Sequence, residues 1–255
     1  MASDPWLLTP MPLDWWNLLH WEPSPDQLQR FTRLYETLMR INQSVNLTRL
    51  THGQEFWEKH IWDSLIGIQP WLSPDHPFAC GSDLPLIHAA IDIGTGGGFP
   101  GLPVAIVRPQ WQVTLLDSIQ KKVTCLADLV KQLQMPHVHP HCDRAEVLGH
   151  HPDHRSHYDL ALIRAVAHPV ACAEYCLPLL NLTGIAVLYR GQWTLAEEHH
   201  LSLALQQLGG ELVEIVPLQT PYTASQRHCI YLRKTQPTPS HYPRRPGVPV
   251  RKPLA

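Results

Sequence analysis

The sequence predicts a doubly wound, Rossmann-like α/β fold, in which helices cover both faces of a largely parallel sheet. Three observations lead to this fold class. A glycine-rich turn at residues 94–98 joins a short apolar run to a segment with helical apolar periodicity. The next apolar run ends in an acid, Asp117. Strand and helix patterns then alternate to about residue 234, as they do in parallel sheets with crossover helices.

The chain in order divides into four segments. Residues 1–70 predict an N-terminal helical extension, with helices near 13–20, over about 25–42 and from about 53 onward. Residues 71–88 predict a proline-rich linker, and residues 89–234 the α/β domain. Residues 235–255 form a basic, proline-rich tail that we expect to be extended or disordered. The tryptophans near the N-terminus favour packing at a core edge over a stacking platform.

The third helix of the extension carries residues with two interpretations. Lys59 and Asp63 are spaced by four, which predicts a solvated ion pair beside a core histidine, His60. A functional role for the same residues stays open from the spacing alone.

Within the α/β domain, apolar runs and helical periodicity give the expected elements. Strands are expected at 87–91, 112–116, 138–142, 158–164, 183–189, 211–217 and 228–233, and helices at 120–134, 168–180 and 194–208. Histidines cluster at 137–141 and 150–157, but no cysteine or acid completes a recognisable ligand spacing. We therefore expect no metal site.

The glycine turn indicates a nucleotide-like ligand. Its glycines Gly94, Gly96 and Gly98 allow backbone N–H groups to approach a ligand closely. In the dinucleotide fingerprint the last position must be small, yet Phe99 stands there. With Asp92 the pattern is D-x-G-x-G-x-G, which resembles the first motif of S-adenosylmethionine (SAM)-dependent methyltransferases. The alternative is a structural glycine turn in another α/β protein.

Three further residues follow strands at the edge where such folds bind ligands. Asp117 can accept hydrogen bonds from both ribose hydroxyls of a nucleoside. Glu146 can accept from a nucleobase amine or cap the next segment. Arg164 ends a strand, where a charge is more often functional than structural.

Composition limits the class of protein. The chain has 255 residues, of which 16% are charged and 44% hydrophobic, so it can form a substantial core. No apolar run approaches the roughly 20 residues of a membrane span, and no leader peptide is visible. Six scattered cysteines without a C-x-x-C pair suit a reducing compartment, and we expect a cytoplasmic protein. The net charge is −2, although residues 233–255 carry six basic side chains and no acid, which suggests an anionic partner for the tail.

Several motifs together resemble one family. They are Asn46-Leu47-Thr48, Lys59-His60 with Asp63-Ser64-Leu65, the segment 92–101, Leu115-Leu116-Asp117-Ser118 with Lys121-Lys122, Arg144-Ala145-Glu146, Arg164-Ala165 and Tyr242-Pro243-Arg244-Arg245. The chain resembles the RsmG (GidB) methyltransferases over about residues 30–254. That family modifies N7 of one guanosine in bacterial 16S ribosomal RNA.

The resemblance implies a seven-stranded SAM-dependent methyltransferase sheet with an antiparallel last strand. It implies SAM as the cofactor, with contacts at Gly94, Phe99, Asp117, Ser118, Ala145, Glu146 and Arg164, to which the glycine turn adds Gly96 and Gly98. We expect 16S ribosomal RNA or a small-subunit particle as the partner of a monomer. The expected RNA-binding residues are Arg49, Lys59, His60, Lys121, Lys122, Arg244, Arg245, Arg251 and Lys252.

No catalytic side chain is expected, because guanine N7 already carries an unprotonated lone pair. Such a nucleophile needs positioning and no general base. Two other classes stay open. A nicotinamide-dependent oxidoreductase would need a small residue at position 99, and a non-catalytic RNA-binding module would leave the glycine turn without a use.

Overall fold

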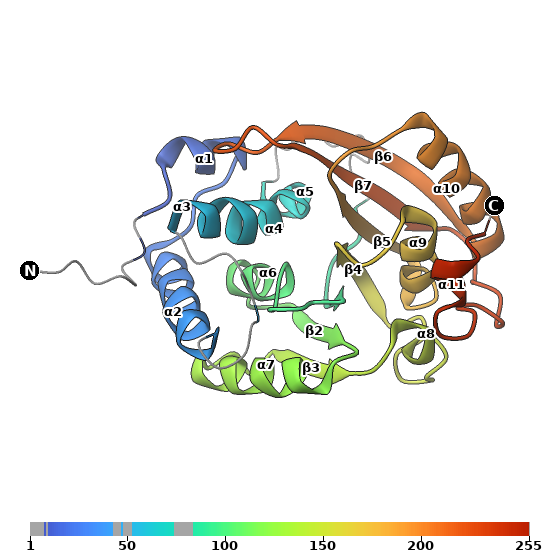
Figure 1. Ribbon diagram of the computed structural model, residues 1–255, viewed down its shortest axis with the longest axis horizontal. Coiled ribbons are helices and arrows are strands. Elements are labelled where there is room, and N and C mark those ends of the chain that lie inside the picture. The colour runs from blue at the N-terminus through green and yellow to red at the C-terminus, as the bar shows by residue number, and fades with distance from the viewer. Residues whose placement is uncertain (1–7, 9, 43–46, 48–52, 74–83, 255) are drawn as a thin grey trace, which may run out of the picture.

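The computed structural model describes residues 8, 10–42, 47, 53–73 and 84–254 (Figure 1). Its centre is a seven-stranded sheet in the order β3-β2-β1-β4-β5-β7-β6. The strands are β1 Ala89–Ile93, β2 Gln112–Asp117, β3 Val138–Cys142, β4 Tyr158–Arg164, β5 Leu180–Arg190, β6 Gly210–Gln219 and β7 Gln226–Lys234. β7 runs antiparallel to both its neighbours, and the remaining pairs are parallel. The predicted fold class is confirmed.

Most residues of the central strands are apolar, as expected for a sheet that is buried on both faces. Leu160 and Leu162 of β4 belong to one core, whereas the alternating residues Ala161 and Ile163 belong to the other. The first core lies under α6 Gly101–Val107, α7 Gln120–Gln132 and the N-terminal helices. The second lies under α9 Pro169–Cys176 and α10 Leu195–Leu208, on the right of Figure 1.

The N-terminal extension packs directly on the first core. It consists of α1 Leu13–Leu18, α2 Pro25–Asn42, α3 Gly53–Phe56, the π-helix η1 Trp57–Trp62, α4 Asp63–Ile66 and α5 Gln69–Leu72. Trp16 is buried and lies against Trp21, Phe31 and Trp57. The packing interpretation of the tryptophans is thus confirmed for Trp16. The start of the proposed linker is helical, and residues 74–83 lie outside the described residues.

Two expected elements differ in extent, each for a physical reason. The helix expected over 168–180 ends at Cys176, because Pro178 has no backbone N–H with which to continue the helical hydrogen bonds. The chain then enters β5 at Leu180, earlier than expected. The first strand runs over 89–93 and not 87–91, since it includes the buried Asp92, which a search for apolar residues passes over.

The C-terminal tail is neither extended nor disordered, so that expectation is wrong. It folds back beside α9 and contains the short helix α11 Val248–Arg251 (Figure 1). Tyr242 and Leu254 are buried in the second core. The proline content predicted an extended backbone, but proline content alone cannot show that Tyr242 and Leu254 are buried in the core.

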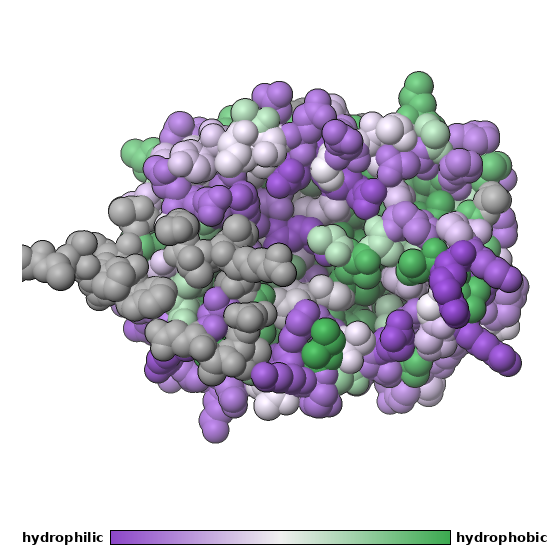
Figure 2. Space-filling model, in the orientation of Figure 1, coloured by the Kyte–Doolittle hydropathy of each residue, from purple (hydrophilic) through white to green (hydrophobic). Residues whose placement is uncertain are grey.

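The surface seen from the same side is mostly hydrophilic, with hydrophobic side chains gathered toward its middle and right (Figure 2). Among the described residues, no helix is both long and apolar enough to cross a membrane.

Candidate cofactor and acceptor sites

The glycine turn links β1 to α6 and is folded onto the end of β2. The amides of Gly94 and Thr95 both donate to the Leu116 carbonyl, at 2.8 and 2.9 Å. Gly94 and Gly96 have φ values of 71° and 60°, in the left-handed region that favours glycine. A Cβ at Gly94 would lie 2.4 Å from Val166 Cγ2, whereas the nearest atom to one at Gly96 would be the Gly94 carbonyl oxygen, at 3.9 Å. The turn therefore presents bare backbone to a ligand beside Gly96.

Asp92 lies fully buried beneath this turn. Its Oδ2 accepts hydrogen bonds from Thr95 Oγ1 at 2.6 Å and from the Gly101 amide at 2.8 Å. Among the described residues, Oδ1 has no hydrogen-bond partner. Burial raises the pKa of Asp92 to about 6, against the hydrogen bonds from Thr95 and Gly101, which lower it. A buried acid with a spare acceptor thus stands behind the loop.

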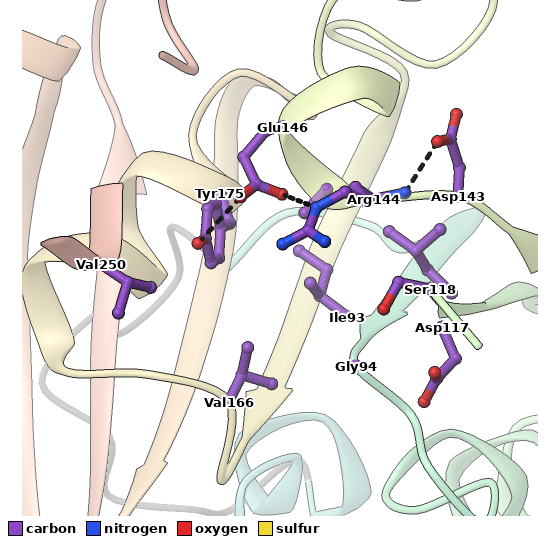
Figure 3. Close-up of a pocket in the computed structure, with 12 residues that line it drawn as sticks. Ile93, Gly94, Asp117, Ser118, Asp143, Arg144, Glu146, Val166, Tyr175 and Val250 are labelled. Atoms are coloured by element: carbon purple, nitrogen blue, oxygen red, sulfur yellow. Dashed lines mark hydrogen bonds and ion pairs between the residues drawn. The ribbon is translucent and has the colours of Figure 1, made fainter. Parts of the chain in front are cut away.

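A first cavity, cavity A, opens at the carboxyl ends of β1, β2 and β4 (Figure 3). Five of the predicted cofactor residues line it, namely Gly94, Asp117, Ser118, Ala145 and Glu146. The other lining residues are Ile93, Leu116, Asp143, Arg144, Val166, Tyr175 and Val250. Apolar surface and a few polar groups therefore meet at the edge where this fold binds nucleosides.

Asp117 combines a structural role with capacity for a ligand. Its Oδ2 accepts from the Gly96 amide at 3.0 Å and its Oδ1 from the Ile119 amide at 2.9 Å. Lys122 Nζ lies 3.8 Å from Oδ2. A carboxylate has about four lone-pair positions, so two of them stay available for ribose hydroxyls.

Glu146 is largely committed to protein donors. Its Oε1 accepts from the Tyr175 hydroxyl at 3.3 Å and from the Gly247 amide at 2.9 Å, and Oε2 lies 3.6 Å from Arg144 Nε. The capping alternative for Glu146 is wrong, because α8 Ala145–Leu148 has no side-chain cap. Contact between Glu146 and a nucleobase stays a prediction.

Gly96, Gly98 and Phe99 are not among the residues that line cavity A. The Phe99 ring is buried and stacks on His60, with ring centroids 4.0 Å apart, and meets the edge of Phe56. It supports the glycine turn from behind by packing. A contact between any of these three residues and the cofactor stays a prediction.

A second cavity, cavity B, contains the remaining predicted cofactor residue, Arg164. Lys59, His60, Asp63, Arg164, Ala165, Tyr189, Arg190, Gly191 and Arg227 line it. Its volume of about 380 Å³ lies within the usual range of small-molecule sites. Four of its nine lining residues are Lys or Arg, and each of them pairs with an acid, which is Glu55, Asp63 or Glu197.

Asp63 holds two of the three arginines of cavity B in place, and the third, Arg190, pairs with Glu197. Arg164 Nη1 lies 2.7 Å from Asp63 Oδ2, and Arg227 Nε lies 3.1 Å from Asp63 Oδ1. The expected Lys59–Asp63 pair is wrong, since Lys59 pairs with Glu55 at 2.8 Å. The π-helix over residues 57–62 turns Lys59 and Asp63 away from the alignment that an α-helix would give.

His60 is buried in the wall of cavity B, as the core interpretation expected. Burial holds the pKa of His60 well below its usual value, and the charges of Arg164 and Lys59 lower it further. The imidazole is therefore neutral at physiological pH and adds no charge to the cavity.

The predicted RNA-binding residues are dispersed. Lys59 and His60 line cavity B, whereas Lys121 and Lys122 lie in the first turn of α7. Arg245, Arg251 and Lys252 are exposed, but Arg244 forms an ion pair with the fully buried Glu174 at 2.6 Å. Arg49 lies outside the described residues. Among the residues that are described, no cluster could hold a metal ion.

Sequence reasoning overlooked several lining residues. Arg190 ends β5 just as Arg164 ends β4, so the same argument could have identified it. Arg227 lies at that edge because β7 is antiparallel and begins there. Tyr175 and Val250 carried no comparable signal, since helix and tail packing alone bring them to cavity A.

The strand order, the glycine turn and cavity A define a SAM-dependent methyltransferase fold. A crystal structure of the antibiotic-resistance methyltransferase Kmr shares this fold, with a TM-score of 0.51, 12% identity, and coverage of 58% of this chain and 87% of that one.

The model of the GidB family, rRNA small subunit methyltransferase G, matches residues 27–230. Ribosomal RNA small subunit methyltransferase G of Trichormus variabilis is 48% identical over 97% of this chain and 99% of its own length. The Nostoc punctiforme protein of the same name matches equally, with 48% identity over the same shares. The chain belongs to the GidB family.

Proposed function

We propose that this protein transfers a methyl group from SAM to N7 of a guanosine in the 16S RNA of the small ribosomal subunit. One observation carries the proposal: cavities A and B lie on two sides of the carboxyl end of β4. Val166 lines cavity A, and its chain neighbours Arg164 and Ala165 line cavity B. A cofactor in one cavity and an acceptor base in the other would meet across this strand end.

The backbone supports a functional role for this strand end. Ala165 has a φ of 57°, in the left-handed region that is unfavourable for residues other than glycine. Such strain concentrates at active sites and ligand clamps.

The residues present fit the cofactor. Asp117 keeps acceptor positions for ribose hydroxyls, Gly96 leaves room beside the loop, and Asp92 Oδ1 offers a buried acceptor behind it. SAM supplies an electrophilic methyl group on a sulfonium sulfur. The chain itself binds the nucleoside in cavity A and orients the base in cavity B.

The proposed reaction requires that the acceptor base be positioned, and it requires no proton transfer from that base. Guanine N7 attacks with an existing lone pair, and the purine becomes cationic as the methyl group arrives. His60, neutral in the wall of cavity B, is then no general base. Arg227, which lines cavity B, supplies a guanidinium suited to the RNA backbone near the target base, whereas Arg190 donates to Glu197 and to the Ala167 carbonyl.

The test is methyl transfer from radiolabelled SAM to small-subunit RNA from a strain that lacks this protein. The expected result is one labelled guanosine, modified at N7. Naked 16S RNA and intact small subunits, assayed side by side, identify the substrate form. Label at an exocyclic amine or a ribose would contradict the proposal, and so would calorimetry that finds NAD binding in place of SAM. We propose further that the enzyme acts as a cytoplasmic monomer.

A further inference from the structure

The C-terminal segment, residues 236–254, lies across the α8–α9 side of the molecule; we call it the strap. It follows the part of the chain that the family model matches, which ends at residue 230. Its helix α11 packs against α9 (Figure 1). Tyr242 and Leu254 anchor it in the second core, where they are 7% and 8% exposed. The strap is therefore an integral part of the fold.

Polar contacts fasten the strap at several points. Arg155 donates to three strap carbonyls, Tyr242 and Thr238 at 2.8 Å each and Pro239 at 3.2 Å. Arg244 Nε and Nη2 donate to the two oxygens of Glu174, Nε at 2.9 and 3.1 Å and Nη2 at 2.6 Å. Charge-assisted, bidentate pairs of this kind fix geometry as well as adding stability.

Two strap residues reach cavity A. The Gly247 amide donates to Glu146 Oε1 at 2.9 Å, and Val250 lines the cavity. Figure 3 shows Val250 on the same side of the cavity as Tyr175, with Glu146 hydrogen-bonded to that tyrosine. Glu146 Oε1 thus connects the strap, through the Gly247 amide, with α8, which carries Glu146, and with Tyr175 of α9.

We propose that the strap forms the wall of the cofactor cavity at its nucleoside end. Val250 supplies apolar surface against the ligand, and the Gly247 amide fixes the Glu146 carboxylate so that its other lone pairs can face the nucleobase. The inference rests on the proposed function in one respect, that cavity A takes SAM. It assigns to Val250 and Gly247 a positioning role in cofactor binding.

The position of Val250 supports this role over a purely structural one. Its side chain lies at the cavity and is 47% exposed, so it contributes little to the core. Truncating an exposed valine that does not contact a ligand should leave the affinity for that ligand unchanged. Val147, on α8, is 45% exposed and does not line cavity A, which makes it a matched control.

The experiment measures the dissociation constant of S-adenosylhomocysteine by titration calorimetry on the full chain. Val250→Ala removes two methyl groups from the wall and is expected to weaken binding about fivefold. Val147→Ala makes the same change outside the cavity and is expected to leave the constant within about twofold. Truncation after residue 236 is expected to weaken binding more than Val250→Ala does. Because the truncated chain can fail to fold, the two valine variants decide the question.

The outcomes separate the two proposals. If Gly96→Val loses binding but Val250→Ala equals Val147→Ala, the strap is only structural and the inference is overturned. If the wild type does not bind S-adenosylhomocysteine, or if folded Gly96→Val binds it like the wild type, the assignment of cavity A fails and the strap inference fails with it. A selective loss in Val250→Ala supports both.

Discussion

The two ends of cavity A are built in opposite ways. The glycine turn is local in sequence: its glycines adopt positive φ values that other residues rarely take, and it covers the fully buried Asp92. The strap is remote in sequence and is fastened by charge-assisted contacts, with Arg244 on Glu174 and Arg155 on strap carbonyls. The ligand-facing loop therefore holds a buried acid at a cost in stability, while the opposite wall contributes stability. Substitutions in the glycine turn should therefore mainly change ligand binding, whereas substitutions at the strap anchors should mainly change stability.

The largest effect on binding is expected at the glycine turn. Gly96→Val should abolish SAM binding, because a branched side chain enters the open space beside the loop and the backbone is left-handed there. Calorimetry measures the binding, and circular dichroism checks that the variant is folded. Near-normal affinity in a folded variant would refute the assignment of this loop.

The strap should show its largest effect in stability. Arg244→Met leaves the fully buried Glu174 without its cation and is expected to destabilise the fold by about 3–5 kcal/mol. Arg245→Met, at the exposed neighbouring residue, is expected to stay within about 0.5 kcal/mol of the wild type. Urea denaturation of the pair decides the matter, and equal stabilities would show that the strap is not fastened through Arg244.

The buried acid of the glycine turn should show in the pH dependence of stability. Folding raises the pKa of Asp92 from 3.8 to about 6, so the native state holds this proton more tightly than the unfolded chain. Its favourable contribution is full below pH 3.8 and is lost as the pH rises through about 6. Asp92→Asn cannot titrate, so relative to the wild type it should gain up to about 3 kcal/mol between pH 4 and 7. A constant difference between the two proteins across that range would contradict the raised pKa.

Asp117 should have a smaller effect on ligand binding. Asp117→Ala is expected to weaken SAM binding by about 1–3 kcal/mol, the scale of charge-assisted hydrogen bonds. Asp128, on the next helix and absent from cavity A, provides the control when changed to Ala. An Asp117→Ala protein with wild-type affinity would show that the ribose lies elsewhere.

The exposed basic residues of the strap should have the smallest effect, and only on RNA. Arg244 is held by Glu174, which leaves Arg245, Arg251 and Lys252 exposed in this segment. If all three contact phosphates, changing them to Ala should flatten the slope of log affinity against log salt by about 2. SAM affinity should not change. An unaltered slope would place the RNA footprint elsewhere, for example at cavity B.

The sequence predicted what depends on local pattern. Glycines in a strand–turn–helix segment and an acid at the next strand end are enough to place Gly94 and Asp117 in cavity A. It could not predict what depends on packing at a distance. The π-helix places Asp63 against Arg164, a contact that the spacing of an α-helix does not predict. Buried side chains such as Tyr242 fix the tail, which was expected to be open, onto the second core. Proline-rich composition describes the backbone of that tail but not the pocket into which Tyr242 fits.

In the proposed reaction, cavity A positions the cofactor and cavity B positions the acceptor base, and no side chain of either cavity removes a proton from the base. The most direct measurement is the single-turnover rate of methyl transfer at saturating RNA and SAM as a function of pH. With guanine N7 as nucleophile, the rate should be nearly constant from about pH 7 to 9 and should persist in His60→Ala, whose retained rate excludes this imidazole as the base. A rise with a log-linear slope near one that His60→Ala or Glu146→Gln abolishes would contradict the claim.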